Sequence, residues 1–331
     1  MKRSLTGIRA TGNLHIGNYL GAIREGVRLQ EEYECLYFIA DMHSLTTNKD
    51  PNLLRMQSLD IAASWIACGL DTQKHLLYRQ SDIPVVAEFA WYLSCCTGMG
   101  LLQKAHSYKD AIANEKEVNH GVFAYPVLMA ADILMYDPDV VPVGKDQKQH
   151  VEMSRDMAGS VNSLYGEGVL KLPEPLINEK VMVIPGLDGR KMSKSYNNEI
   201  PLFSSEKELR KKVMSITTDS TALEAPKTLD GTLVGQLFSF FASQGEYEDL
   251  NKRLSKGGLG WGHAKEELFQ AINREIKEAR DRYQALRSDE DQLNGILEEG
   301  RDKALKIGIP VLNRLREAVG MSPQTCSFKK I

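Results

Sequence analysis

The pattern of hydrophobic and polar positions divides the chain into two parts. Over the first two hundred residues, short runs rich in β-branched and aromatic residues alternate with longer segments whose apolar residues recur at helical spacing. Such alternation is typical of α/β proteins, in which right-handed crossovers make the strands parallel. The expected strands are Arg3–Ile8, Cys35–Ala40, His75–Tyr78, Val140–Val143 and Val181–Ile184, and the expected helices include Asn18–Glu31, Leu53–Cys68, Val85–Cys95 and Asp146–Leu164.

After about residue 205 the strand pattern stops, and charged amphipathic segments of helical spacing replace it. The helices expected there are Glu206–Met214, Thr232–Ala242, Lys265–Leu286, Asp289–Ile307 and Val311–Val319. We therefore predict an α/β domain with a parallel sheet over residues 1–200 and a helical domain over residues 201–331. The last helix is expected to be able to pack back on the first domain.

Composition and charge narrow the class of protein only slightly. With 331 residues, 42% of them hydrophobic and 26% charged, the chain is an ordinary globular protein. Its longest apolar stretch, Val122–Ala131, is far short of the roughly 20 residues of a membrane span, and no export signal is visible. We therefore expect a cytoplasmic protein with no membrane partner. The net charge of −3 still leaves room for a local basic face.

A glycine-containing turn joins the first expected strand to the first expected helix. The backbone N–H groups and the positive helix end at such a turn favour an anion. The turn matches neither G-x-G-x-x-G nor the P-loop pattern. It contains His15-Ile16-Gly17-Asn18, which taken alone is equally consistent with an ordinary helix N-terminus that happens to include a histidine.

A second motif, Lys191-Met192-Ser193-Lys194-Ser195, lies in a polar stretch after a strand candidate. Two ammonium groups on such a loop suit a reaction in which negative charge builds on departing phosphates. The simpler alternative is a solvated basic loop, which the presence of both motifs in this order disfavours. Together the two motifs resemble the HIGH-type and KMSKS signatures of class I aminoacyl-tRNA synthetases.

This resemblance implies a Rossmann-type catalytic domain over residues 1–200 that binds ATP with Mg²⁺, the metal being held by the phosphates and not by a protein metal site. The expected catalytic residues are His15, Asn18, Lys191 and Lys194. The residues expected to bind ATP are Arg9, Gly17, Asn18, Gly144, Asp146, Met192 and Lys194. Arg9 lies where many members of the family have a different residue, and Ala111 lies where some members have a lysine that binds ATP. Both differences could change the affinity for ATP.

One carboxylate marks the candidate amino-acid site. The two motifs are too close in sequence for a large editing insertion, which favours a substrate that needs no second sieve. If Pro126 occupies the first position of a helix, Tyr125, Met129, Asp132 and Tyr136 fall on one stripe. Burying Asp132 in this otherwise apolar stripe without a partner would be costly. The residues alone leave two alternatives, a cap on a neighbouring element or an acceptor for a ligand.

Leu128–Leu134 followed by Val141–His150 resembles the tryptophanyl-tRNA synthetases, and this resemblance implies that Asp132 accepts the indole N–H of tryptophan. The residues then expected to bind tryptophan are Leu5, His43, Tyr125, Met129, Asp132 and Gln147. Leu5 replaces an aromatic residue common in the family. A lone histidine after a strand, such as His43, is also explained by a structural role.

The resemblance further implies a tryptophan–tRNA ligase, a homodimer that charges tRNA(Trp) and recognises the anticodon with its helical domain. The residues alone favour solvated helix faces as the explanation of the basic positions there; these are Lys207, Arg210, Lys211, Lys212, Arg274, Lys277, Arg280 and Arg282. The alternatives are a tyrosyl-tRNA synthetase, a synthetase-like nucleotidyltransferase and a non-catalytic tRNA-binding relative. Asp132 within Ala-Ala-Asp-Ile-Leu disfavours the first. The complete lysine motif and the helical C-terminal part disfavour the second, and the presence of both intact signatures disfavours the third.

Overall fold

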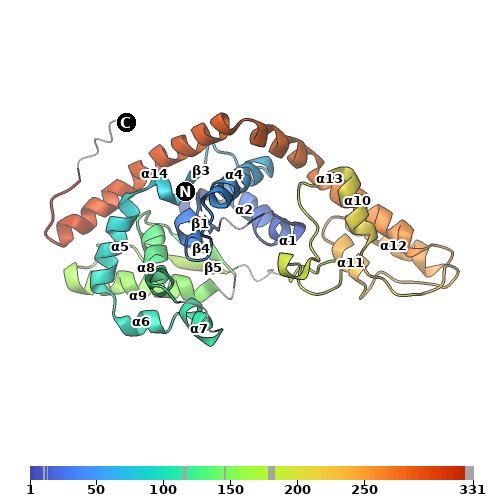
Figure 1. The fold of residues 1–331 in the computed structure, drawn as a ribbon, viewed down its shortest axis with the longest axis horizontal. Coiled ribbons are helices and arrows are strands. Elements are labelled where there is room, and N and C mark those ends of the chain that lie inside the picture. The colour runs from blue at the N-terminus through green and yellow to red at the C-terminus, as the bar shows by residue number, and fades with distance from the viewer. Residues whose placement is uncertain (10–11, 13, 115–117, 145–146, 178–182, 325–331) are drawn as a thin grey trace.

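Five parallel strands form the centre of the protein (Figure 1). The computed structural model describes residues 1–331 except 10–11, 13, 115–117, 145–146, 178–182 and 325–331. The sheet order is β3-β2-β1-β4-β5, and every pair of neighbours is parallel. The strands are β1 (Lys2–Ile8), β2 (Tyr33–Ile39), β3 (Leu76–Arg79), β4 (Val140–Val143) and β5 (Glu174–Ile177). The predicted parallel-sheet α/β fold is therefore confirmed.

The fifth strand differs from the prediction. Residues 181–182 of the expected strand Val181–Ile184 lie outside the described residues, and residues 183–184 are not in a strand. Glu174–Ile177 pairs with β4 instead. This segment contains Pro175 and follows Pro173, which argued against a strand, but a strand at the edge of a sheet tolerates proline.

Helices cover both faces of the sheet. Along β2, Cys35, Tyr37 and Ile39 enter one hydrophobic cluster, whereas Leu36 and Phe38 enter the other. This alternation is the period of two expected for a strand buried on both faces. The first face is covered by α1 (Ile16–Asn18), α2 (Arg24–Arg28), α4 (Pro51–Ala67) and α13 (Trp261–Ser288), and the second by α5 (Val85–Cys96), α6 (Met99–Gln103), α8 (His120–Leu134) and α9 (Lys148–Tyr165).

Two helices near the motifs are less regular than predicted. Between α1 and α2 the chain forms a π-helical turn over Tyr19–Ile23, a feature often found at functional sites. Pro126 does not occupy the first position of α8, as we had predicted, but lies inside the helix. The reason is the cap at Asn119, whose side chain accepts from the Val122 N–H over 3.1 Å and starts the helix two turns earlier.

The helical C-terminal region contains α10 (Glu206–Met214), α11 (Leu233–Phe238), α12 (Gln244–Ser255), α13 and α14 (Glu290–Ala318). The sequence reading missed α12, although its capping box was visible: the Ser243 N–H donates to the Glu246 carboxylate over 2.8 Å. The two predicted last helices are one, with Pro310 inside it. The apolar residues on both sides of this proline, Ile309 and Leu312, enter the same core and keep the helix continuous.

Helix α14 covers the free edge of the sheet at β3, along which it runs (Figure 1). Its Leu297 enters the cluster on one face and its Ala304 enters the cluster on the other. Between them, a Cβ atom added to Gly300 would lie only 1.9 Å from the Leu77 carbonyl oxygen. The helix backbone therefore contacts the edge strand directly and shields it from pairing with another chain.

We expect the substitution Gly300→Ala to lower the free energy of unfolding by about 2–3 kcal/mol, because the new methyl group meets a backbone atom that cannot turn away. Gly295→Ala on the same helix is the control, since its Cβ would have nothing within 4 Å. This change should raise stability by up to about 1 kcal/mol through helix propensity. Urea denaturation measures both, and equal effects of the two substitutions would contradict this packing.

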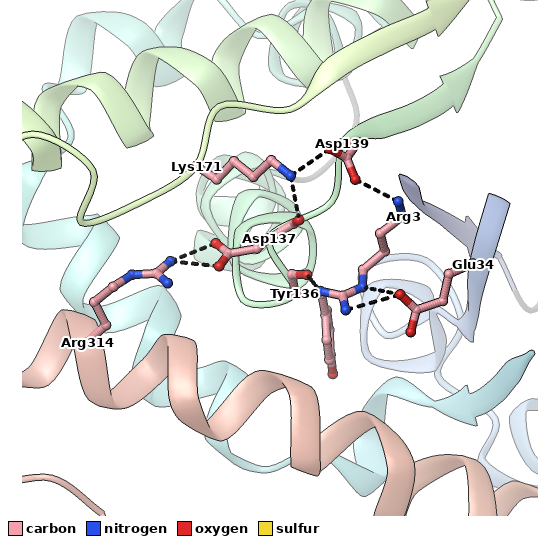
Figure 2. A network of polar contacts seen from close by, with 7 residues as sticks. All are labelled: Arg3, Glu34, Tyr136, Asp137, Asp139, Lys171 and Arg314. Carbon is pink, nitrogen blue, oxygen red and sulfur yellow. Dashed lines mark hydrogen bonds and ion pairs between the residues drawn. The ribbon is translucent and has the colours of Figure 1, made fainter. Parts of the chain in front are cut away.

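A polar network fixes the amino-terminal side of the sheet to α14 (Figure 2). Nη2 of Arg314 lies 2.7 and 2.9 Å from the two carboxylate oxygens of Asp137, in the turn after α8. Nζ of Lys171 lies 2.7 Å from Asp139, whose other oxygen accepts from the Arg3 N–H over 2.6 Å. The network thus joins the end of α8 to β1 and α14, at the opposite end of the strands from the predicted motifs.

Candidate active site

The sheet topology gathers the predicted site residues at one edge. From β1 the chain adds β2 and β3 on one side of the sheet, and from β4 it adds β5 on the other side. A topological switch point therefore lies between β1 and β4. Open α/β sheets bind ligands beyond the carboxyl ends of their strands at this point. His15 follows β1, Gly144 follows β4, His43 lies in α3 (Asp41–Ser44) after β2, and Gln80 follows β3.

The turn after β1 ends at His15, which caps the first helical turn. The His15 backbone N–H donates to Oδ1 of Asn18 over 3.0 Å, so the Asn18 side chain fixes the start of the helix. The Gly17 N–H points at Sδ of Met192, 3.3 Å away. A Cβ on Gly17 would lie 3.0 Å from the His15 ring and 3.4 Å from that sulfur, so a larger residue would separate them. Arg9, before the turn, is exposed.

The lysine motif lies against this turn although it is far away in sequence. The Ile16 N–H donates to the Ile200 carbonyl over 2.9 Å, and the Leu202 N–H donates to the Leu14 carbonyl over 3.0 Å. A Cβ on Gly12 would lie 2.3 Å from Nζ of Lys194, which places the ammonium group directly over the turn.

The two signatures therefore meet through His15, Gly17, Met192 and Lys194. Both lysines of the motif, Lys191 and Lys194, have exposed side chains.

Asn198 organises the lysine loop from within. It is 2% exposed, accepts from the Ser193 N–H over 2.8 Å, and donates to Oδ1 of Asp188 over 2.7 Å. A further bond of 3.2 Å joins its amide to the Lys191 carbonyl. Sequence reasoning did not select Asn198 as a site residue, because only the folded loop brings the Asp188 carboxylate and the backbone groups of Ser193 and Lys191 around it.

Three titratable side chains, His15, Lys194 and Glu199, influence one another where the two motifs meet. Burial lowers the pKa of His15, and the positive charge of Lys194 lowers it further, while Glu199 acts in the opposite direction. Burial also lowers the pKa of Lys194, again against the influence of Glu199. Within the described part of the chain, Nδ1 of His15 is buried without a hydrogen-bond partner. An imidazole nitrogen, an ammonium group and a helix N-terminus thus face one turn, an arrangement suited to a polyanion.

Asp132 occupies a second, buried part of the site. It is 3% exposed, and its Oδ2 lies 2.7 Å from Nε2 of His43. The Gln80 amide donates to both carboxylate oxygens, over 2.9 and 2.8 Å. Burial raises the pKa of Asp132, and the hydrogen bonds from His43 and Gln80 partly offset this. Asp132 is therefore paired with side chains from two neighbouring elements, and an ionised carboxylate with about four acceptor positions keeps capacity for another donor.

Tyr125 lies beside His43, which is the partner of this carboxylate. The Tyr125 ring packs edge-on against His43, with 4.8 Å between ring centroids. Burial raises the pKa of Tyr125, and the charge of Arg9 acts in the opposite direction. Leu5 in β1 is fully buried, and the half-buried Met129 packs against the same hydrophobic cluster.

Gln147 lies less deep in the site, and its side chain is exposed. Its backbone N–H donates to the Gly144 carbonyl over 2.9 Å, which closes the turn after β4. The expected ribose contact, Asp146, lies outside the described residues. Ala111, in α7 (His106–Ala113), is buried. Gln80 was missed because a single polar residue at a strand end carries no motif, although its place after β3 was a signal.

Among the residues that the structure describes, no group of three or more His, Cys, Asp or Glu side chains is placed to hold a metal ion. None of their helices combines the length and the apolar character that a membrane span requires. The cysteines in this part of the chain are free thiols, with Cys35 buried and Cys95 exposed.

Comparison with known proteins agrees with the geometry. The family model described as tRNA synthetases class I (W and Y) matches residues 2–277. The tryptophan–tRNA ligase of Fusobacterium nucleatum is 46% identical over 321 residues, which are 97% of this chain and 98% of the relative. The crystal structure of Campylobacter jejuni tryptophanyl-tRNA synthetase complexed with ADP and tryptophan has a TM-score of 0.92 and 46% identity, covering 96% of this chain and 100% of its own.

The chain belongs to the class I tRNA synthetases for tryptophan and tyrosine. The predictions of this family, of an aminoacyl-tRNA synthetase and of a tryptophan–tRNA ligase function are confirmed by these relatives. The tyrosyl-tRNA synthetase of Archaeoglobus fulgidus shares the fold at a TM-score of 0.60, but it is only 17% identical.

Proposed function

We propose that this chain activates L-tryptophan with ATP and transfers the tryptophanyl group from the adenylate to tRNA(Trp). One observation carries the proposal: the buried cluster of Asp132, His43 and Gln80 lies at the same edge of the sheet as Lys194 over the Gly12 turn. A buried acceptor and a candidate polyanion site thus lie beyond the same ends of the strands. The Campylobacter jejuni neighbour, with ADP and tryptophan bound, supports this pairing of ligands.

Selection of tryptophan is assigned to Asp132. The indole nitrogen is a donor only, and Asp132 offers an acceptor whose orientation is held by His43 and Gln80. A site built to bond a substrate N–H rejects analogues without it, because its own buried group then lacks a partner. Leu5 and Met129 are proposed to pack on the ring, and Tyr125 and Gln147 to hold the amino and carboxylate groups.

The proposed chemistry is in-line attack of the tryptophan carboxylate on the α-phosphate of ATP. His15, Asn18 and Gly17 are assigned to the phosphates and the adenosine, with Met192 and Arg9 beside them, and Gly144 and Asp146 are assigned to the ribose. Lys194 and Lys191 neutralise the departing pyrophosphate. Catalysis then consists of positioning and charge stabilisation, with no covalent enzyme intermediate. Mg²⁺ is proposed to accompany ATP on the phosphate oxygens.

We assign residues 1–200 to catalysis and residues 201–331 to recognition of the tRNA anticodon. Lys207 and Lys211 on α10 and Lys277 on α13 are exposed and available for phosphate contacts. Arg280, which the sequence suggested as part of a basic face, is 5% exposed and donates to Asn273 over 3.0 Å, so it is removed from this set. Phosphate contacts would make the tRNA affinity fall with rising salt.

A homodimer in the cytoplasm completes the proposal. Helix α5 exposes 66% of Trp91, and Met99 in the following helix is 62% exposed. Large apolar side chains on a surface are typical of protein–protein contacts. Sedimentation analysis should therefore give twice the mass of one chain, and Trp91→Glu should shift the protein toward the monomer.

The test of this function is aminoacylation of total bacterial tRNA. We expect charging with tryptophan and no other amino acid. Charging with tyrosine would favour the tyrosyl alternative, and adenylate formation without tRNA charging would favour a nucleotidyltransferase. A protein that binds tRNA but forms no adenylate would be a non-catalytic relative.

A further inference from the structure

Glu199 follows the lysine motif in sequence and lies beside the turn that contains His15. On one side of it in the chain, Asn198 is held within the lysine loop. On the other side, the Ile200 carbonyl accepts from the Ile16 N–H over 2.9 Å. The backbone of Glu199 is therefore fixed between the lysine loop and the turn that contains His15.

The Glu199 carboxylate is not explained by packing. Its side chain is half-buried, and among the described residues Oε2 is buried without a hydrogen-bond partner. Leaving a buried acceptor unsatisfied is unfavourable, and a carboxylate near a phosphate site repels the ligand. A neutral residue of similar size would avoid the repulsion, so the negative charge itself needs a reason.

The charged neighbours of Glu199 supply that reason. Its charge acts on His15, from the turn, and on Lys194, from its own loop, and in both cases it favours the protonated form. From α4, the side chain nearest to the Gly12 turn is Gln57, which is uncharged. Glu199 is therefore the acidic side chain whose field acts on the ammonium group over the turn.

We propose that Glu199 is a positioning residue that attracts the Lys194 ammonium in the empty site and yields it to the phosphates when ATP binds. The proposal rests on the proposed function, since it assigns ATP to this turn. In the empty protein the Glu199 charge favours the protonated form of Lys194, whose ammonium lies over Gly12. In the complex the Glu199 carboxylate repels the bound triphosphate and weakens ATP binding. More of the attraction between Lys194 and the phosphates then acts in the transition state, where charge develops on the pyrophosphate.

Two effects of Glu199→Gln follow, and a merely structural role predicts neither. The KM for ATP in tryptophan-dependent pyrophosphate exchange should fall about fivefold, because a repelling charge is removed. The alkaline limb of the pH–rate profile should move to lower pH. An opposite charge raises the pKa of an ammonium group, so without Glu199 the pKa of Lys194 falls and the group loses its proton earlier.

The experiment compares the intact protein with Glu199→Gln, Glu199→Asp and Glu167→Gln between about pH 6 and 10. Glu167 is exposed in the turn after α9, so its replacement removes the same charge away from the site. The aspartate variant keeps the charge and should restore the alkaline limb, even if the glutamine variant folds poorly. An unchanged KM and pH profile in a folded Glu199→Gln protein would overturn the proposal.

Calorimetric titration with ATP on the same proteins separates this proposal from the proposed function. If the unmodified protein binds ATP but shows no tryptophan-dependent exchange, the proposed function fails. Tighter ATP binding by Glu199→Gln would still support the role of Glu199, and equal binding by both proteins would refute it.

Discussion

Replacing Lys194 by alanine should slow tryptophan-dependent pyrophosphate exchange by about a thousandfold. An ammonium group about 4 Å from the developing charge is worth about 4 kcal/mol at an effective dielectric constant near 20. Each 1.36 kcal/mol is about a factor of ten in rate. Because the charge on pyrophosphate develops in the transition state, the loss should appear mainly in kcat and less in the KM for ATP.

Lys207→Ala is the matched control for Lys194→Ala, since Lys207 is an exposed lysine on α10. Its rate of exchange should stay close to that of the unmodified protein. Thermal unfolding of both variants shows whether the fold is intact. A Lys194→Ala protein that is folded and retains more than about a tenth of the exchange rate would remove Lys194 from the proposed mechanism.

Replacing Asp132 by asparagine should lower kcat/KM for tryptophan by about a hundredfold. The change preserves the shape of the side chain but removes the negative charge, and a hydrogen bond to a charged group is worth about 1.5–3 kcal/mol. The His43 and Gln80 contacts, at 2.7 to 2.9 Å, would then face a weaker acceptor as well. Steady-state exchange at varied tryptophan concentration measures the loss.

The sharper measure is the preference for tryptophan over benzothienylalanine, in which sulfur replaces the indole N–H group. The unmodified protein should prefer tryptophan strongly, and Asp132→Asn should reduce that preference. Asp60→Asn is the control, because Asp60 is another buried carboxylate, 2.7 Å from Nε of Arg287. That variant should lose stability and keep its preference. An unchanged preference in Asp132→Asn would show that another group recognises the indole.

The parts of the fold that were predictable depend on local pattern. β1 to β4 have apolar runs bounded by turns, and α10 has a clear amphipathic pattern, so their positions followed from sequence. β5 was missed because its proline is tolerated only at the sheet edge, which the sequence does not reveal. That α14 continues through Pro310 was also not predictable, because it depends on packing against the hydrophobic cluster on the second face of the sheet.

The candidate site divides in the same way. The residues of the two motifs were found from their order along the chain, because the chemistry of phosphate binding is concentrated in short segments. Gln80, Asn198 and Glu199 were not selected, since each matters through a partner far away or a loop that folds around it. Asp132 is intermediate: its stripe on a helix was visible in the sequence, but its pairing with His43 was not.

The most direct test of the central claim is ATP–pyrophosphate exchange with each of the twenty amino acids. We predict exchange that depends on tryptophan, with no comparable rate for tyrosine or any other amino acid. Exchange that depends on tyrosine, or no exchange with tryptophan at all, would contradict the assignment of the buried Asp132 carboxylate to the indole ring.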